Sequence, residues 1–332
     1  MTSTTTALVA SASPRGTGPR PHGLPRAMLI LHRWALWFWL LLVAVAALTT
    51  LWMYGWGADA AHAEFVLRGC ANGVADSGCD YNGPAYSRYH LADNISGGLI
   101  NLVPLLTALW AGASLIGREL ENGTAQLAWT QSVSPARWLT AKLAVPAALL
   151  TAGTLLLVLL HRLAWGEYTE LFRGRGPQQW HDTGNYFANG TLLPAYALLG
   201  LTIGALTGLL VGRSMAALGS AFFASLAVEF VTTSLRPHLW PAKTLTSKNG
   251  YPEYIGMVLD DGALTSTGKR VTDPLCVSDT QCLATHDIVG FYRDYHPASH
   301  FWPLQLMETG VVLAIAAAAT ATAFWLLRRR TA

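Results

Sequence analysis

The sequence predicts an all-α integral membrane protein with six transmembrane helices. Of its 332 residues, 52% are hydrophobic and 12% are charged, whereas a soluble domain carries about 25% charged residues. Six apolar runs are long enough to cross about 30 Å of hydrocarbon as helices, and an isolated strand would leave its backbone unpaired in lipid. These runs cover residues 34–53, 95–115, 143–160, 192–211, 215–235 and 306–327.

The charge distribution predicts the orientation. Six spans place both termini on one side, and the segments on that side contain half of the 22 Lys and Arg residues. The positive-inside rule therefore predicts cytoplasmic termini, with extracytoplasmic loops at residues 54–94, 161–191 and 236–305, the last one large. The cytoplasmic basic residues are Arg15, Arg20, Arg26, Arg33, Arg118, Arg137, Lys142, Arg213, Arg328, Arg329 and Arg330.

The segment before the first span divides into two parts. Residues 1–23 are rich in Thr, Ser, Pro, Gly and Arg and predict a disordered cytoplasmic tail. Residues 24–33 mix apolar and basic side chains, as an interfacial helix does. A signal peptide cleaved near Ala61 or Ala63 is the less favoured alternative, because the apolar run has the length of a true span and tryptophans flank it.

The four cysteines lie as two close pairs in the predicted extracytoplasmic loops, Cys70 with Cys79 and Cys276 with Cys282. Disulfides persist in oxidising compartments, so we expect each pair to form a local disulfide; cross-loop pairing and unpaired cysteines are the alternatives. The spacing does not favour zinc. The nearby residues His286, His296 and His300 are expected to belong to an ordinary polar loop.

A glycine repeat marks the fourth span, where Gly200, Gly204, Gly208 and Gly212 recur every four residues. Such a repeat forms a smooth helix face that a neighbouring helix can approach closely. Packing within one subunit is favoured, and a dimer interface or a moving contact between helices is the alternative. The turn at residues 213–214 is so short that the fifth span must be an adjacent antiparallel helix.

Glu229 is an ionisable residue within the fifth predicted span. Charged groups at membrane depth are costly and often functional. Glu229 is expected either to line a substrate path or to be a packing residue near the outer interface.

Motifs for chemistry by this chain are absent from the sequence, which contains no H-E-x-x-H, no G-x-S-x-G and no phosphate loop. Residues 262–270 only approach a phosphate loop, and they lie on the extracytoplasmic side. A hydrolase built from the acids and histidines of residues 285–300 is a minor alternative.

The loop GRELENGTAQLAWTQSVSPARWLTAK, residues 117–142, contains the only two acids expected on the cytoplasmic side, Glu119 and Glu121. Residues 118–133 predict a short amphipathic surface helix, which Gly123 weakens by about 1 kcal/mol. Ser134 and Pro135 predict the cap and first turn of the next helix. The expected apolar face comprises Leu120, Thr124, Leu127 and Ala128.

This loop resembles the cytoplasmic loop between the second and third spans of type-2 ABC transporter permeases. The matching features are one or two acids, a Gly-Thr pair at Gly123 and Thr124, a short helix, a serine and a basic residue before the next helix. The resemblance implies a coupling helix seated on a separate ABC ATP-binding subunit, and a second permease copy or homologous permease around a translocation path. It also implies a bacterial plasma-membrane location, with export as the commoner direction.

The same resemblance implies that ATP and Mg are used by the partner subunit, and that this chain binds no cofactor, metal or nucleic acid and is not an enzyme. Membrane lipid surrounds it. The residues expected to serve ATPase coupling are Arg118, Glu119, Glu121, Gly123, Thr124, Trp129 and Arg137, with Trp129 anchoring the loop. A membrane anchor or sensor with ligand-binding outer loops, and a membrane-embedded enzyme, are the alternatives. The sequence does not rank lipid-like compounds, drugs or peptides as cargo.

Overall fold

The computed structural model describes residues 23–70, 83–131, 133–172, 180–253, 256–276 and 279–331. The predicted disordered tail, apart from Gly23, lies outside these residues. The described chain is mostly helical, and six of its helical segments are long and apolar enough to cross a membrane. The prediction of six such helices is therefore confirmed.

The first membrane-crossing segment is α2 (Arg33–Tyr54), which continues as α3 (Trp56–Leu67). The second is α4 (Pro84–Trp110), which continues as the π-helix η2 (Ala111–Gly117) and then as α5 (Arg118–Glu121). The others are α7 (Pro135–Leu171), α9 (Leu192–Val211), α10 (Ser214–Leu235) with the short 3-10 helix η4 (Arg236–His238), and α12 (Phe301–Thr331). The interfacial segment predicted before the first span is the helix α1 (Gly23–Leu31). Shorter helices are α6 (Thr124–Thr130), α8 (Thr183–Ala188), α11 (Thr280–Thr285) and η5 (Ala298–His300).

Several helices are longer than the predicted spans, and a polar cap accounts for the early start of α4. The second predicted span starts at residue 95, but α4 already starts at Pro84. Glu64 of α3 accepts hydrogen bonds from the backbone N–H groups of Ala85 (2.8 Å) and Tyr86 (3.0 Å). A carboxylate at this position satisfies N–H groups that the first helical turn leaves free.

The prediction of an all-α protein is wrong for the segment before the last helix. This segment forms a four-stranded antiparallel sheet in the order β1-β4-β2-β3. The strands are β1 (Lys243–Ser247), β2 (Gly256–Thr265), β3 (Arg270–Val271) and β4 (Ile288–Pro297). Arg293 and Asp294 made β4 resemble a polar loop, but both are paired across the sheet, Arg293 with Asp261 (3.1 Å) and Asp294 with Arg270 (2.6 Å).

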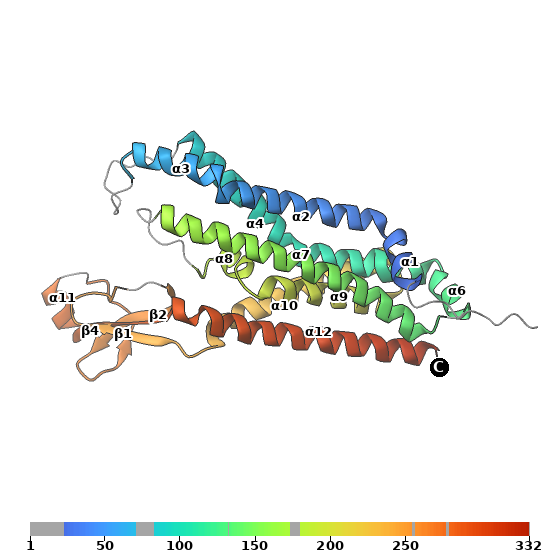
Figure 1. Cartoon of the computed structure of the whole chain (residues 1–332). Coiled ribbons are helices and arrows are strands. Elements are labelled where there is room, and N and C mark those ends of the chain that lie inside the picture. The colour runs from blue at the N-terminus through green and yellow to red at the C-terminus, as the bar shows by residue number, and fades with distance from the viewer. Residues whose placement is uncertain are drawn as a thin grey trace, which may run out of the picture.

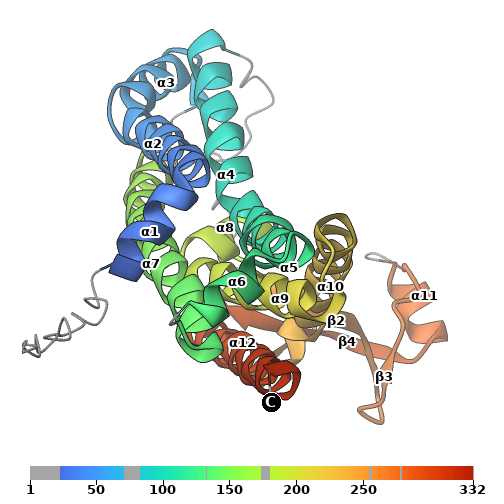
Figure 2. The ribbon, with the colours of Figure 1, turned by 90° about the vertical axis from the view of Figure 1, so that its right-hand side faces the viewer.

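The helices form an elongated bundle whose two ends differ (Figure 1). One end carries α1, α6 and the C-terminal end of α12, whereas the opposite end carries α3, the sheet and α11. Helix α9 lies inside the bundle and packs against α4, η2, α7, α10 and α12, as the end-on view in Figure 2 shows. In its most apolar stretch 72% of the residues are buried, against 17% in α10.

The glycine face of α9 packs within the chain, against α4 and η2. A Cβ atom on Gly200 would lie 2.3 Å from the carbonyl oxygen of Pro104, and one on Gly204 would lie 2.4 Å from that of Ala108. Gly208 likewise meets η2. Gly212 has a different role, because it ends α9 in a left-handed conformation with φ of 65°. The predicted antiparallel contact of α9 with α10 is also present.

Candidate functional site

The loop singled out in the sequence is two short helices, α5 and α6, rather than one continuous helix. Gly123 separates them with φ of 70°, a left-handed conformation that ends α5 and starts α6. The Thr124 hydroxyl donates to the Glu119 carbonyl oxygen at 3.2 Å across this corner. The expectation of a helix over residues 118–133 is therefore corrected.

The buried face of α6 also differs from the predicted one. Ala125 is fully buried, whereas Leu127 is 57% exposed and Thr124 is exposed. Leu120 and Ala128, assigned to the same face as Leu127, are partly buried against the core at this end of the bundle. The break at Gly123 changes the helical phase between α5 and α6, so Leu127 does not share the buried face of Leu120.

Glu119 is held inside the protein by helix α7. Its carboxylate accepts from the Lys142 ammonium at 2.6 Å and from the Trp138 indole N–H at 3.2 Å. The Lys142 side chain is only 2% exposed and also lies over the Trp138 ring, 5.3 Å from its centroid. Because a buried ammonium needs a compensating charge, Glu119 fixes α5 to α7.

Glu121 is held by a different helix, α10. Its carboxylate accepts from the Ser214 backbone N–H at 2.9 Å and from the Ser214 hydroxyl at 2.5 Å. Ser214 is the first residue of α10, where a negative charge satisfies free N–H groups and the helix dipole. The two acidic residues of the loop therefore fasten it to α7 and α10.

The remaining predicted residues divide into buried and exposed ones. Trp129 packs edge-on against Trp138 with ring centroids 5.6 Å apart, in keeping with an anchor. Ser134 caps α7 as predicted, because its hydroxyl accepts from the Arg137 backbone N–H at 3.4 Å. The side chains of Arg118 and Arg137 are exposed, and no described residue forms an ion pair with either.

His32, between α1 and α2, borders the same cluster. Burial and the nearby Lys142 ammonium lower the pKa of His32 to about 4, against a smaller opposing effect of Glu119. The imidazole is therefore neutral at pH 7 and adds no positive charge beside Lys142.

Glu229 lies on the exposed surface of α10. A different acid, Glu308, is buried, and it was not predicted from the sequence. Glu308 of α12 is fully buried and forms a bidentate ion pair with Arg236 at 2.7 and 3.1 Å. Tyr196 donates to the same carboxylate at 2.9 Å. Glu308 falls within the predicted sixth span, so the rule that selected Glu229 would have found it.

The predicted pair Cys276 and Cys282 forms a disulfide, so its sulfurs offer no thiolate to a metal at the adjacent His286. Of the other pair, Cys70 is buried and Cys79 lies outside the described residues.

The polar loop expected around His296 and His300 is instead a buried junction between the sheet and α12. The Nδ1 atoms of the two rings are 2.9 Å apart, and His296 Nε2 lies 2.9 Å from the Pro237 carbonyl oxygen.

A comparison with protein families finds a match. The family model described as ABC-2 membrane transporter related covers residues 40–236. This range includes α5, α6 and the helices to which Glu119 and Glu121 attach them. No curated protein and no solved structure matches the chain.

Proposed function

The chain belongs to the ABC-2 membrane transporter related family, and on that premise we propose that it is the permease subunit of an ABC exporter. Membership implies partnership with an ATP-binding subunit. In this proposal the partner binds and hydrolyses ATP with Mg, and the present chain, which is not an enzyme, forms the path for the cargo. Both termini, α6 and the partner lie on the cytoplasmic side of a bacterial plasma membrane. The family resemblance favours export as the direction.

The observation that carries the proposal is the attachment of α5 and α6 to the membrane helices α7 and α10. Glu119, Glu121 and Trp129 hold the loop to α7 and α10, while Leu127 is exposed on α6. An exposed leucine among polar side chains suits the centre of a protein contact, and exposed cations such as Arg137 at the start of α7 give a contact orientation and specificity.

The same contacts connect α6 to the membrane helices, so they would transmit a movement of α6 to them. A displacement of α6 by the partner would pass through Glu119 and Lys142 to α7, and through Glu121 and Ser214 to α10. It would also pass along the chain through η2 into α4. Three membrane helices would thus respond to one contact, which is what coupling of ATP hydrolysis to a membrane path requires.

The exposed face of α10 supports a second permease copy. Glu229 lies on this face among apolar side chains such as Phe223 and Phe230. A carboxylate facing lipid is costly, so the position calls for a facing protein or a hydrated path. In our proposal α10 faces the path, and Glu229 lines it between the two copies.

Co-purification tests the proposed partner. The tagged full-length protein, solubilised from its native membrane, should bring down an ATP-binding subunit. Leu127→Asp should reduce that recovery by about tenfold, because a new carboxylate would be buried in the contact. Leu275→Asp is the matched control, because Leu275 is exposed in the sheet segment at the opposite end, and it should have no effect. Absence of an ATPase from the wild-type preparation would refute the proposal and favour an anchor or sensor.

A further inference from the structure

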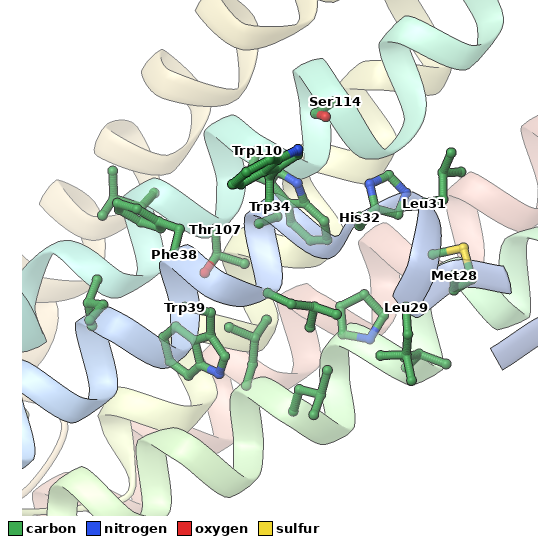
Figure 3. A pocket seen from close by; sticks show the side chains of 18 of the residues that line it. Met28, Leu29, Leu31, His32, Trp34, Phe38, Trp39, Thr107, Trp110 and Ser114 are labelled. Carbon is green, nitrogen blue, oxygen red and sulfur yellow. The ribbon is translucent and has the colours of Figure 1, made fainter. Parts of the chain in front are cut away.

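A groove opens between α1, α2, α4 and α7, at the end of the bundle that carries α1, α6 and the C-terminal end of α12. Figure 3 labels lining side chains from α1, α2, α4 and η2, and residues of α7 and Arg118 of α5 complete the lining. Its volume is about 510 Å³, within the range of roughly 300–1,000 Å³ typical of small-molecule pockets. The groove lies within a single chain and is separate from the exposed face of α10.

One end of the groove is apolar. Phe38, Trp39 and Leu42 of α2 face Val103 of α4 and Leu149 of α7 across it. All five residues lie inside the predicted membrane spans. An alkyl chain placed among them gains about 0.8 kcal/mol per buried methylene relative to water.

The other end is polar and basic. Arg118 and Ser114 line it from α5 and η2, beside His32. The acids next to Arg118 are already engaged, Glu119 by Lys142 and Glu121 by Ser214. No described residue forms an ion pair with Arg118, so its guanidinium is available to an external anion.

The polar end also has unused hydrogen-bonding capacity. His32 Nε2 and Trp110 Nε1 are buried, and neither has a hydrogen-bond partner among the described residues. Arg33 adds a further cation nearby, where it lies over the Trp34 ring. Basic residues at a membrane surface each attract anionic lipid by about 1 kcal/mol.

We propose that this groove binds an anionic glycerophospholipid from the leaflet on the side of the termini. One acyl chain lies between α2, α4 and α7, and the phosphate contacts Arg118. An apolar slot that ends in a guanidinium with no ion-pair partner among the described residues fits an amphiphile with a net negative head, because the cationic group of a zwitterionic head would be repelled by Arg118 and Arg33. The site does not require the ATPase partner, so a failure of the lipid test would leave the proposed function intact, and a failure of the proposed function would leave the lipid site intact.

The test measures lipid retained by the purified full-length protein. The protein is reconstituted in mixed vesicles of phosphatidylglycerol and phosphatidylcholine, extracted into mild detergent and analysed by native mass spectrometry. The wild type should retain phosphatidylglycerol in preference to phosphatidylcholine. Arg118→Gln should lower that preference about tenfold, since it removes a charge-assisted contact.

A pair of tryptophan substitutions on α7 tests the place of binding. Leu149→Trp fills the groove and should abolish retention, whereas Leu155→Trp should retain lipid as the wild type does. The two leucines are similarly exposed, 36% and 45%, but only Leu149 lines the groove. Equal retention by both variants, or an unchanged preference in Arg118→Gln, would overturn the proposal.

Discussion

Glu119 and Glu121 illustrate how two residues of one type in one loop come to hold different helices. They are two positions apart in α5, so their side chains leave the helix about 200° apart. Their partners are 23 and 93 residues away in sequence. The sequence indicated that these carboxylates were unusual, because no other acid was expected on their side. It could not indicate that Glu119 is partly buried against Lys142 while Glu121 is exposed and caps α10, since both outcomes depend on contacts distant in the chain.

Removal of the Glu119 charge should destabilise the protein more than removal of an exposed charge. Glu119→Gln leaves the buried Lys142 ammonium without its counter-charge and should cost about 3 kcal/mol. Thermal melting of the detergent-solubilised protein measures this loss. Lys142→Met in the Glu119→Gln background should recover most of it, and Arg137→Gln should leave the melting temperature unchanged. A melting temperature for Glu119→Gln equal to that of the wild type would show that the pair does not hold α5.

At the scale of elements, the glycine repeat of α9 indicated close helix packing without indicating the neighbour. A spacing of four residues marks a face of a helix but does not identify what packs there. The short turn predicted α10 as a neighbour of α9, yet Gly200 and Gly204 face α4. Helix α6 shows a related limit, because one left-handed glycine changed which residues of the next helix are exposed. Helix positions were thus predictable, and their contacting faces less so.

Gly204→Ala should weaken the packing of α9 on α4. The added Cβ would lie 2.4 Å from the Ala108 carbonyl oxygen and 2.7 Å from the Ala111 Cβ, and overpacking of this kind costs about 2 kcal/mol. Gly219→Ala in α10 is the control, because its added Cβ would meet nothing within 4 Å. The melting temperature should fall for the first variant and stay level or rise for the second. Equal melting temperatures would contradict the close approach of α9 to α4.

At the scale of the whole molecule, hydropathy was enough to predict six membrane helices, because crossing lipid imposes both length and composition on a helix. The sheet could not be predicted in the same way. Its strands are short or contain charged residues that are neutralised only by cross-strand partners, as Asp294 is by Arg270. The buried Arg236–Glu308 pair lies where this sheet segment joins α10 and α12.

The proposed orientation predicts opposite labelling of the two ends of the molecule. No described cysteine is a free thiol, so single introduced cysteines report their own accessibility. A cysteine in place of the exposed Lys248, beyond β1, should react with a membrane-impermeant maleimide on intact cells. A cysteine in place of Thr331, at the end of α12, should react only after permeabilisation. The reverse pattern would invert the topology and place α6 away from any cytoplasmic ATPase.

The central claim is that α6 is the seat of an ATP-binding subunit, and cross-linking in the native membrane tests it most directly. A photoreactive amino acid is placed at residue 127 of the full-length protein, and at residue 275 as the control. The account predicts that illumination joins an ATP-binding subunit to residue 127 and not to residue 275. Absence of that adduct from residue 127, while the protein is inserted and cross-links to other partners, would contradict it.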